Sequence, residues 1–157
     1  MAIEKVRQYL RQWKADDRIR EFEVSSATVE LAASALSCEP ARIAKTLSFA
    51  VGERCVLIVT AGDARVDNQK FKEAFGAKAK MLSQDEVYLR VGHEVGGVCP
   101  FAVNPDVAVY LDESLYRFET VYPASGSSNS AIELTLPELE SYSRFNGRVN
   151  VTKGWQV

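Results

Sequence analysis

The hairpin near the middle of this sequence constrains its fold more than any other feature. Residues 46–51 and 55–60 are strand-like runs on either side of Gly52-Glu53-Arg54, a short glycine-containing connection of the kind that joins antiparallel strands. The second run, from Cys55 to Thr60, is apolar almost throughout. A strand without alternating polar residues is typical of a central strand that is buried on both faces. The sequence therefore predicts a sheet with a covering layer on each side.

Helical patterns occur before and after this hairpin. Apolar residues recur every three or four positions from Ile3 to Trp13, which predicts an N-terminal helix with one apolar face. Two Ser/Thr-x-x-Glu capping boxes predict helices that begin after Ser83 and after Thr135. The second of these helices is expected to end at Gly147. Further helical segments are expected at 27–36 after Ser25-Ser26, from Glu39-Pro40 to Lys45, and at 66–75 before Gly76.

Shorter apolar runs predict the remaining strands, at residues 18–24, 78–82, 107–111, 118–122, 132–134 and 149–151. Helices and strands are mixed without a strict β-α-β alternation, which favours an α+β fold with a mixed sheet. The 157 residues suffice for one domain with a sizeable core, and no repeat or linker divides them. We therefore expect a single domain that spans residues 1–157.

Composition argues against several classes of function. The formal net charge is −2, so any contact with RNA must come from a local basic patch, and no DNA partner is expected. Three cysteines without a CxxC spacing and a single histidine argue against a disulfide framework and a metal site. No apolar run approaches the ~20 residues that cross a bilayer, and the N-terminus lacks the apolar core of a signal peptide, so we expect a cytoplasmic protein without a membrane partner. The candidate basic residues are Lys70, Lys72, Lys78 and Lys80, with Arg42, Lys45 and Arg65; a solvated face is the alternative for the lysine run.

Residues 92–101, Gly-His-Glu-Val-Gly-Gly-Val-Cys-Pro-Phe, form the most unusual loop of the chain. Three glycines and a proline within ten residues exclude a helix interior or a central strand, yet the loop also carries several apolar side chains. No Cβ covers the backbone N–H groups of Gly96 and Gly97. The loop is therefore a candidate pocket floor, with these two N–H groups as oxyanion donors. A plain tight turn is the alternative.

Lys45 is the first side chain that we consider for a chemical role. It stands between Ala44 and Thr46-Leu47, where a helical turn is expected to enter an apolar strand, so its ammonium could reach a partly buried site. Such a lysine can hold a phosphate or a carbonyl oxygen, or act as a base where burial lowers its pKa. A surface lysine whose stem lies along the protein is the alternative.

Three other groups have weaker claims to a chemical role. Cys99 and His93 could form a nucleophilic pair, although a buried cysteine and a loop histidine explain them as well. Residues 124–130, Ala-Ser-Gly-Ser-Ser-Asn-Ser, could bind a ligand through hydroxyls or form a polar turn. The acid pair Asp112-Glu113 is expected in a solvated connection.

Several short motifs occur in an order that carries a family resemblance. They are Ser-Ala-Thr-Val at 26–29, Ile-Ala-Lys-Thr-Leu at 43–47, Val-Asp-Asn at 66–68, Gly-Gly-Val-Cys-Pro-Phe at 96–101, and Ala-Ser-Gly-Ser at 124–127 before Ile-Glu-Leu at 132–134. Together they cover about residues 20–142, and the chain resembles the YbaK/EbsC family. Its members are trans-acting relatives of the editing domain inserted in bacterial prolyl-tRNA synthetases. The resemblance implies an α+β fold with a mixed, barrel-like sheet flanked by helices.

The resemblance also implies hydrolysis of the ester in a mischarged aminoacyl-tRNA, without a metal or a cofactor. The amino acid removed would be small, such as alanine or cysteine, and the tRNA would be that for proline or a related one. An aminoacyl-tRNA synthetase is a candidate partner. The family lysine falls on Lys45, and the glycine pair falls on Gly96 and Gly97 as catalytic residues. The substrate-binding residues expected around them are Thr46, Val98, Cys99, Phe101, Gly126, Ser127 and Ser128.

The chain departs from the related synthetase domain at one point. That domain carries a Gly-x-His element in its last turn, whereas Gly126-Ser127-Ser128 has no histidine. A histidine-dependent step and the preferred amino acid therefore do not carry over. Two alternatives to the deacylase remain open: a module of the same fold that binds a tRNA or a small ligand without catalysis, and a thiol hydrolase that uses Cys99 and His93.

Overall fold

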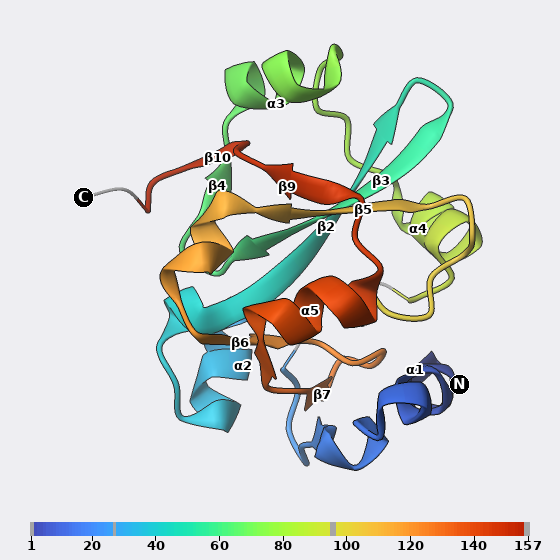
Figure 1. Ribbon diagram of the computed structural model, residues 1–157, viewed down its shortest axis with the longest axis vertical. Coiled ribbons are helices and arrows are strands. Elements are labelled where there is room, and N and C mark those ends of the chain that lie inside the picture. Colours follow the sequence, from blue (N-terminus) through green and yellow to red (C-terminus); the bar gives the residue numbers. More distant parts are fainter. Residues whose placement is uncertain (1, 27, 95–96, 156–157) are drawn as a thin grey trace.

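A curled, mixed six-stranded sheet is the central element of the protein. The computed structural model, which describes residues 2–26, 28–94 and 97–155, gives the strand order β8-β6-β2-β3-β5-β9 (Figure 1). The β2–β3 and β6–β8 pairs are antiparallel, whereas β2–β6, β3–β5 and β5–β9 are parallel. This α+β architecture confirms the predicted fold class. The strands are β2 (Ile43–Val51), β3 (Arg54–Ala61), β5 (Ala108–Asp112), β6 (Thr120–Pro123), β8 (Leu134–Thr135) and β9 (Gly147–Val149).

The predicted hairpin is present, and β3 is its fully buried strand. Its turn contains Gly52, whose φ of +61° suits glycine. After the first residue, every residue of β3 is buried. Leu57 and Val59 face the larger of two cores, while Val56 and Ile58 face the smaller one. The apolar run in the sequence therefore reflects a layer on each side of the sheet.

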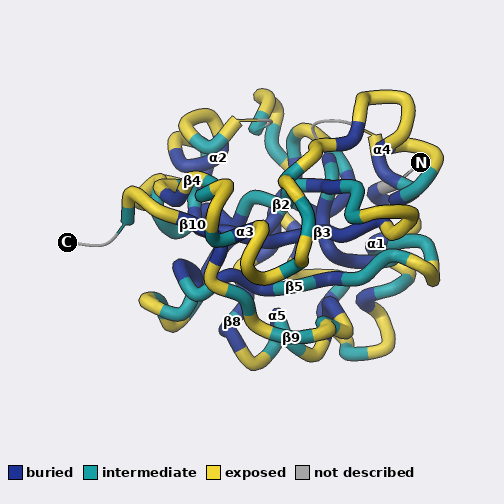
Figure 2. The backbone as a smooth tube through the Cα atoms, turned by 90° about the horizontal axis from the view of Figure 1, so that it is seen from above, coloured by how far each residue is buried: buried dark blue, intermediate teal, exposed yellow. Residues whose placement is uncertain are grey.

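Helices provide these two layers. Residues of α1, α4 and α5 share the larger core with β3, whereas α3 packs on the other face, where Phe71 lies 4.9 Å from Phe49 between ring centroids. α2 packs at the edge beside Ile43 and Tyr122. Figure 2 shows buried backbone through the centre and exposed backbone in the outer helices and turns. The helices are α1 (Ala2–Leu10), α2 (Val29–Leu36), α3 (Asn68–Phe75), α4 (Gln84–Val91) and α5 (Leu136–Ser143).

The predicted capping boxes agree with the sequence, but several other helix ends do not. Ser83 and Thr135 form the predicted capping boxes. α1 ends at Leu10, and a 3-10 turn covers the rest of the predicted helix up to Trp13. α3 begins at Asn68 after its cap Asp67, because Val66 belongs to β4.

The cap of α2 is Thr28, whose hydroxyl accepts from the N–H of Leu31, so the predicted cap at Ser25-Ser26 is wrong. The predicted start of this helix at residue 27 lies outside the described residues. α5 ends at Arg144 in a left-handed conformation, and Gly147 instead begins β9.

Three further predictions are wrong for identifiable reasons. A 3-10 turn at Pro40–Arg42 ends before β2, so Lys45 belongs to a strand paired with β3 rather than to a helical turn. Residues 78–82 form a single bridge from Met81 to Phe49 and no strand, because β2 pairs with them only there. Asp112 is buried rather than solvated, since it accepts hydrogen bonds from Ser114 of the turn that it caps and from the distant Val151 and Thr152.

Two small sheets tie distant segments together. β1 (Arg20–Glu21) pairs antiparallel with β7 (Ser130–Ala131), and β4 (Arg65–Val66) pairs antiparallel with β10 (Thr152–Lys153). The first pair covers only two residues of the strand predicted at 18–24. The strands predicted at 132–134 and 149–151 are largely wrong, because residues 132–133 separate β7 from β8 and residues 150–151 separate β9 from β10. The first pair joins the N-terminal region to residues 124–130, the serine-rich turn. The second pair joins the C-terminal region to the segment that follows residues 62–64, the turn after β3.

Candidate functional site

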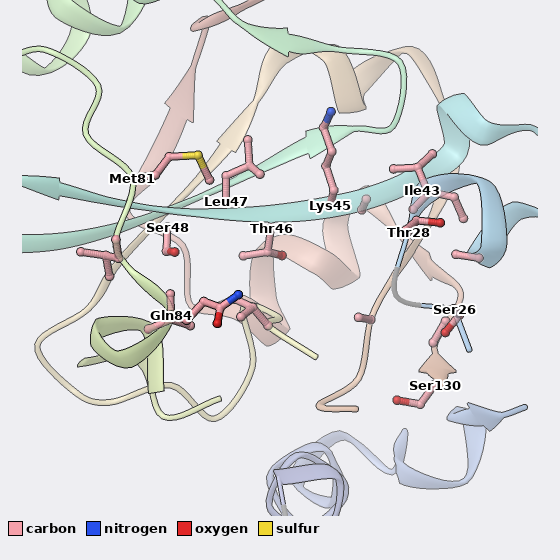
Figure 3. Close-up of a pocket in the computed structure, with 18 residues that line it drawn as sticks. Ser26, Thr28, Ile43, Lys45, Thr46, Leu47, Ser48, Met81, Gln84 and Ser130 are labelled. Carbon is pink, nitrogen blue, oxygen red and sulfur yellow. The ribbon is translucent and has the colours of Figure 1, made fainter. Parts of the chain in front are cut away.

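A pocket of about 440 Å³ opens beside β2 (Figure 3). Its wall is mostly apolar, and Lys45 is the one charged side chain among the described residues that line it. The wall comes from the start of α2, from β2, from the segment before and within α4, and from two loops. The lining residues are Ser26, Thr28, Val29, Ala32, Ile43, Ala44, Lys45, Thr46, Leu47, Ser48, Met81, Leu82, Gln84, Val87, Val98, Ala124, Ser130 and Ala131.

Strand alternation along β2 gives the pocket two kinds of polar group. Lys45 and Leu47 point to one side of the strand, whereas Thr46 and Ser48 point to the side of Gln84 (Figure 3). The hydroxyl of Thr46 is buried without a hydrogen-bond partner among the described residues. A buried hydroxyl without a partner costs stability, and this one belongs to a residue that lines the pocket.

The ammonium of Lys45 is held at one point and kept half-buried. Its Nζ donates to the carbonyl oxygen of Ala64 at 2.5 Å, which uses one of its three protons. Burial lowers the pKa of Lys45, and the negative charge of Asp63 opposes this change most strongly. Glu30 also raises the pKa of Lys45, whereas Arg65 lowers it. Among the described residues, the other two protons of this ammonium have no hydrogen-bond acceptor.

Gly97 of the 92–101 loop, called the glycine loop below, touches the serine-rich turn of residues 124–130. Gly97 is buried, and a Cβ on it would lie 2.8 Å from the Cα and N of Ser127 and 2.9 Å from the carbonyl carbon of Gly126. Only glycine permits this approach of two backbones. The N–H of Gly97 donates to the carbonyl of Glu94 at 3.0 Å, so in this structure it is engaged in a turn. Gly96 lies outside the described residues.

The serine-rich turn is tied to the segment before α2. Asn129 Nδ2 donates to the carbonyl of Phe22 at 2.8 Å, which orients the amide so that its Oδ1 faces Ser127. Ser127 Oγ therefore donates to Asn129 Oδ1 at 2.9 Å and accepts from Ser130 Oγ at 2.7 Å. Ser130 lines the pocket, and the carbonyl of Ser128 accepts from the N–H of Ser26. The turn thus holds one pocket wall in place.

Cys99, His93 and Phe101 lie behind this wall and are fully buried. Cys99 Sγ is 3.5 Å from His93 Nε2, but this nitrogen lies 2.7 Å from the carbonyl oxygen of Phe101 and must donate its proton there. Burial raises the pKa of the Cys99 thiol to about 12 and lowers that of His93. A neutral thiol without access to the pocket is a poor nucleophile, so the geometry argues against a thiol hydrolase.

Comparison with known proteins shows what kind of domain carries this pocket. The family model of the aminoacyl-tRNA editing domain matches residues 23–142. The chain belongs to this family. The match confirms the resemblance carried by the motifs, and it includes every described lining residue of the pocket.

Individual relatives of this editing domain agree with the assignment. The uncharacterized protein YwhH of Bacillus subtilis (strain 168) is 51% identical over 157 residues, which are 99% of this chain and 100% of YwhH. A proline–tRNA ligase of Bacillus cytotoxicus is 32% identical over 88 residues, 55% of this chain but 16% of the ligase. The "Crystal structure of a putative trans-editing enzyme for prolyl tRNA synthetase" superposes with a TM-score of 0.87 and 25% identity, covering 98% of both chains. The fold and family are therefore those of an editing domain.

The structure of the editing domain brings together some of the predicted site residues and not others. Lys45, Thr46 and Val98 line the pocket. Gly126, Ser127 and Ser128 belong to the turn that supports the wall, and Cys99 and Phe101 lie behind it, so none of these five is a lining residue. The lining also includes Ser130, from the 124–130 segment that was a candidate for binding a ligand through hydroxyls. The sequence interpretation gave no ligand-binding role to four other polar lining residues, which are Ser26, Thr28, Ser48 and Gln84. A signal existed for the first two, which fall in the 26–29 motif.

The described residues also bear on metals and membranes. No group of three or more His, Cys, Asp or Glu side chains in residues 2–26, 28–94 and 97–155 could hold a metal ion. Over the same residues, every helix is too short or too polar to cross a bilayer.

Proposed function

We propose that this editing domain hydrolyses the ester bond of a mischarged aminoacyl-tRNA and that the pocket beside β2 receives the ester. The observation that carries the proposal is a mostly apolar pocket with Lys45 as its charged side chain. An aminoacyl ester needs no strong nucleophile, because it is already activated. It needs orientation and a group that stabilises the negative charge on its carbonyl oxygen.

In the proposal, Lys45 supplies the positive charge that stabilises this carbonyl oxygen. With one proton held by the carbonyl of Ala64, its ammonium has two donors for the substrate's carbonyl oxygen or for the terminal phosphate. The backbone N–H groups of Gly96 and Gly97 are the proposed second set of oxyanion donors. Because the N–H of Gly97 donates to Glu94, that turn has to open before Gly97 can donate to the substrate.

Water completes the reaction in this scheme. Its oxygen attacks the carbonyl carbon, the bond from that carbon to the ribose oxygen breaks, and the ribose oxygen takes up a proton. The neighbouring hydroxyl of the terminal adenosine is placed to assist this proton transfer. The products are the free amino acid and the uncharged tRNA.

The apolar wall selects the amino acid by size. Val87 of α4 and Val98 of the 92–101 loop are among its apolar lining residues. A small residue such as alanine or cysteine, attached to the tRNA for proline, is the proposed substrate. One methylene is worth only about 1–3 kcal/mol in such a pocket, so a panel of mischarged tRNAs is needed to find the preferred one.

Single-turnover deacylation tests the proposal. Transfer RNA for proline charged with alanine, cysteine or proline is mixed with excess protein, and release of the amino acid is followed over time. Lys45→Ala should lower the rate by about 100-fold or more, as expected for loss of one oxyanion-stabilising group. Lys5→Ala, at an exposed lysine outside the pocket, is the matched control and should retain the wild-type rate.

Two results would contradict the proposal. A fully active Lys45→Ala variant would remove the lysine from the mechanism. Tight binding of all three charged tRNAs by the wild-type protein, with no release of amino acid, would favour a binding module of the same fold instead.

A further inference from the structure

The turn after β3 holds the carbonyl that binds Lys45, and the turn has little freedom to move. A Cβ on Gly62 would lie 2.0 Å from the carbonyl oxygen of Pro40, so the backbones of two segments are in direct contact there. The N–H of Gly62 donates to the carbonyl of Ala41 at 3.3 Å, and that of Ala64 donates to the carbonyl of Ala61 at 3.1 Å. The position of the Ala64 carbonyl therefore follows from the position of this turn.

An ion pair fastens the same turn from its other side. Asp63 receives two hydrogen bonds from Arg117, at 2.6 Å and 3.0 Å. Arg117 is itself fixed, because its Nε donates to the carbonyl of Ser114 at 2.8 Å and its guanidinium lies 5.0 Å from the Trp155 ring and 4.8 Å from the Phe118 ring. A planar fork with this many contacts holds one geometry, in contrast to most exposed ion pairs.

The C-terminal strands anchor both the turn and the ion pair. β10 pairs with β4, directly after the turn. The indole of Trp155 donates to the Thr152 hydroxyl at 2.8 Å, and this hydroxyl donates to the buried carboxylate of Asp112 at 2.6 Å. These C-terminal residues lie beyond the region 23–142 that the family model matches.

We propose that Asp63, which is held by Arg117 and the C-terminal segment, is a positioning residue. It places the ammonium of Lys45 for the reaction and keeps it protonated. It acts in two ways: it fixes the turn whose carbonyl holds the ammonium, and it sets a negative charge near the ammonium. The inference rests on the proposed function of Lys45, but its physical content concerns the lysine itself.

The charges around Lys45 give the sign of the effect. Burial lowers the pKa of Lys45, Asp63 and Glu30 raise it, and Arg65 lowers it. The guanidinium of Arg117 keeps Asp63 ionised by lowering the pKa of that carboxyl. Loss of the charge on Asp63 therefore lowers the pKa of Lys45. If the reaction needs the ammonium, the alkaline limb of its pH profile then moves to lower pH.

Asp63→Asn tests the proposal, with Glu113→Gln as the matched control. Glu113 forms a similar two-point pair with Arg148, at 2.9 Å and 3.1 Å, and does not line the pocket. The titration of Lys45 is followed by NMR of its Cε in wild type and both variants. We expect the Lys45 titration and the alkaline limb of kcat/KM to move to lower pH in Asp63→Asn, with kcat/KM on that limb reduced about two- to fivefold, as for a partly exposed charge pair. Glu113→Gln should match wild type in both measurements.

Arg117→Lys separates the effect of Asp63 on the position of Lys45 from the effect of its charge. It is the second test variant if Asp63→Asn does not fold. It keeps a positive partner for Asp63 but loses the planar fork. We expect kcat to fall while the Lys45 titration stays near that of wild type. Lys45 titrations that coincide in wild type and Asp63→Asn, an equal shift in Glu113→Gln, or a kcat of Arg117→Lys equal to that of wild type would overturn the inference. The NMR titration needs no activity, so failure of the deacylase proposal and failure of this inference are distinguishable.

Discussion

Gly97→Ala should force apart the two loops that support the pocket wall. The new Cβ would lie 2.8 Å from backbone atoms of Ser127 and 2.9 Å from the carbonyl carbon of Gly126. Because all three atoms belong to the backbone, no side-chain rotation relieves the clash. An ordinary contact of 3.4 Å requires one loop to retreat by about 0.6 Å. Overpacking of this kind costs about 1–3 kcal/mol, which corresponds to a melting temperature lower by roughly 2–12 °C in a chain of this length.

Gly147→Ala is the matched control for this prediction. A Cβ on Gly147, in β9, would meet nothing within 4 Å, and the residue does not need a positive φ. Replacement of glycine at such a position is neutral or stabilises by about 0.4–1 kcal/mol. Thermal and urea unfolding, followed by circular dichroism, compares both variants with wild type. If Gly97→Ala melts at or above the wild-type temperature, the inferred contact between the glycine loop and the serine-rich turn is wrong.

Two further predictions concern groups with shifted pKa values. Arg18 forms an ion pair with Glu138 at 2.7 Å and lowers the pKa of that carboxyl to about 2, below the ~4.3 of an unfolded chain. Glu138→Gln should therefore reduce the free energy of unfolding by about 0.5–1 kcal/mol at pH 7, and this difference should shrink as the pH falls from about 4 toward 2; urea unfolding at several pH values measures it, and a gap that does not depend on pH would contradict it. Because burial raises the pKa of Cys99 to about 12, native protein at pH 8 should react with a thiol reagent at half-exposed Cys38 before Cys99, and Cys99→Ala should retain deacylation. Labelled peptides identified by mass spectrometry test the first part, and loss of activity in Cys99→Ala would revive the thiol hydrolase.

Local patterns predicted the helices and the hairpin because their causes lie within a few residues. The capping boxes at Ser83 and Thr135 each satisfy two backbone N–H groups within the same turn. The unbroken apolar run of β3 has a simple cause as well, since each face of that strand meets a separate core. For such elements the sequence contains all the information that decides the local conformation.

The short strands and the buried acid could not be predicted in this way. β10 exists because β4 lies beside it, and the two pairing partners are about 87 residues apart in the chain. Asp112 looked solvated because an acid pair in a connection usually is. It is buried because Val151 and Thr152, distant in sequence, supply donors that satisfy its oxygens. Long-range partners decided both cases.

Lys45 of the candidate site could be predicted in part from the local sequence and depends in part on long-range partners. Its residue type and its position after a short turn were enough to select it from the sequence. Its geometry was not, because a lysine on a helical turn would share a face with residues three or four positions away, whereas in β2 it stands opposite Thr60 of β3. The chain then turns tightly after β3 and returns the carbonyl of Ala64 to the lysine Nζ. The hairpin register, rather than the local sequence around Lys45, therefore brings the ammonium to the turn after β3, and a shift of the register by one residue would move it to the opposite face of the sheet.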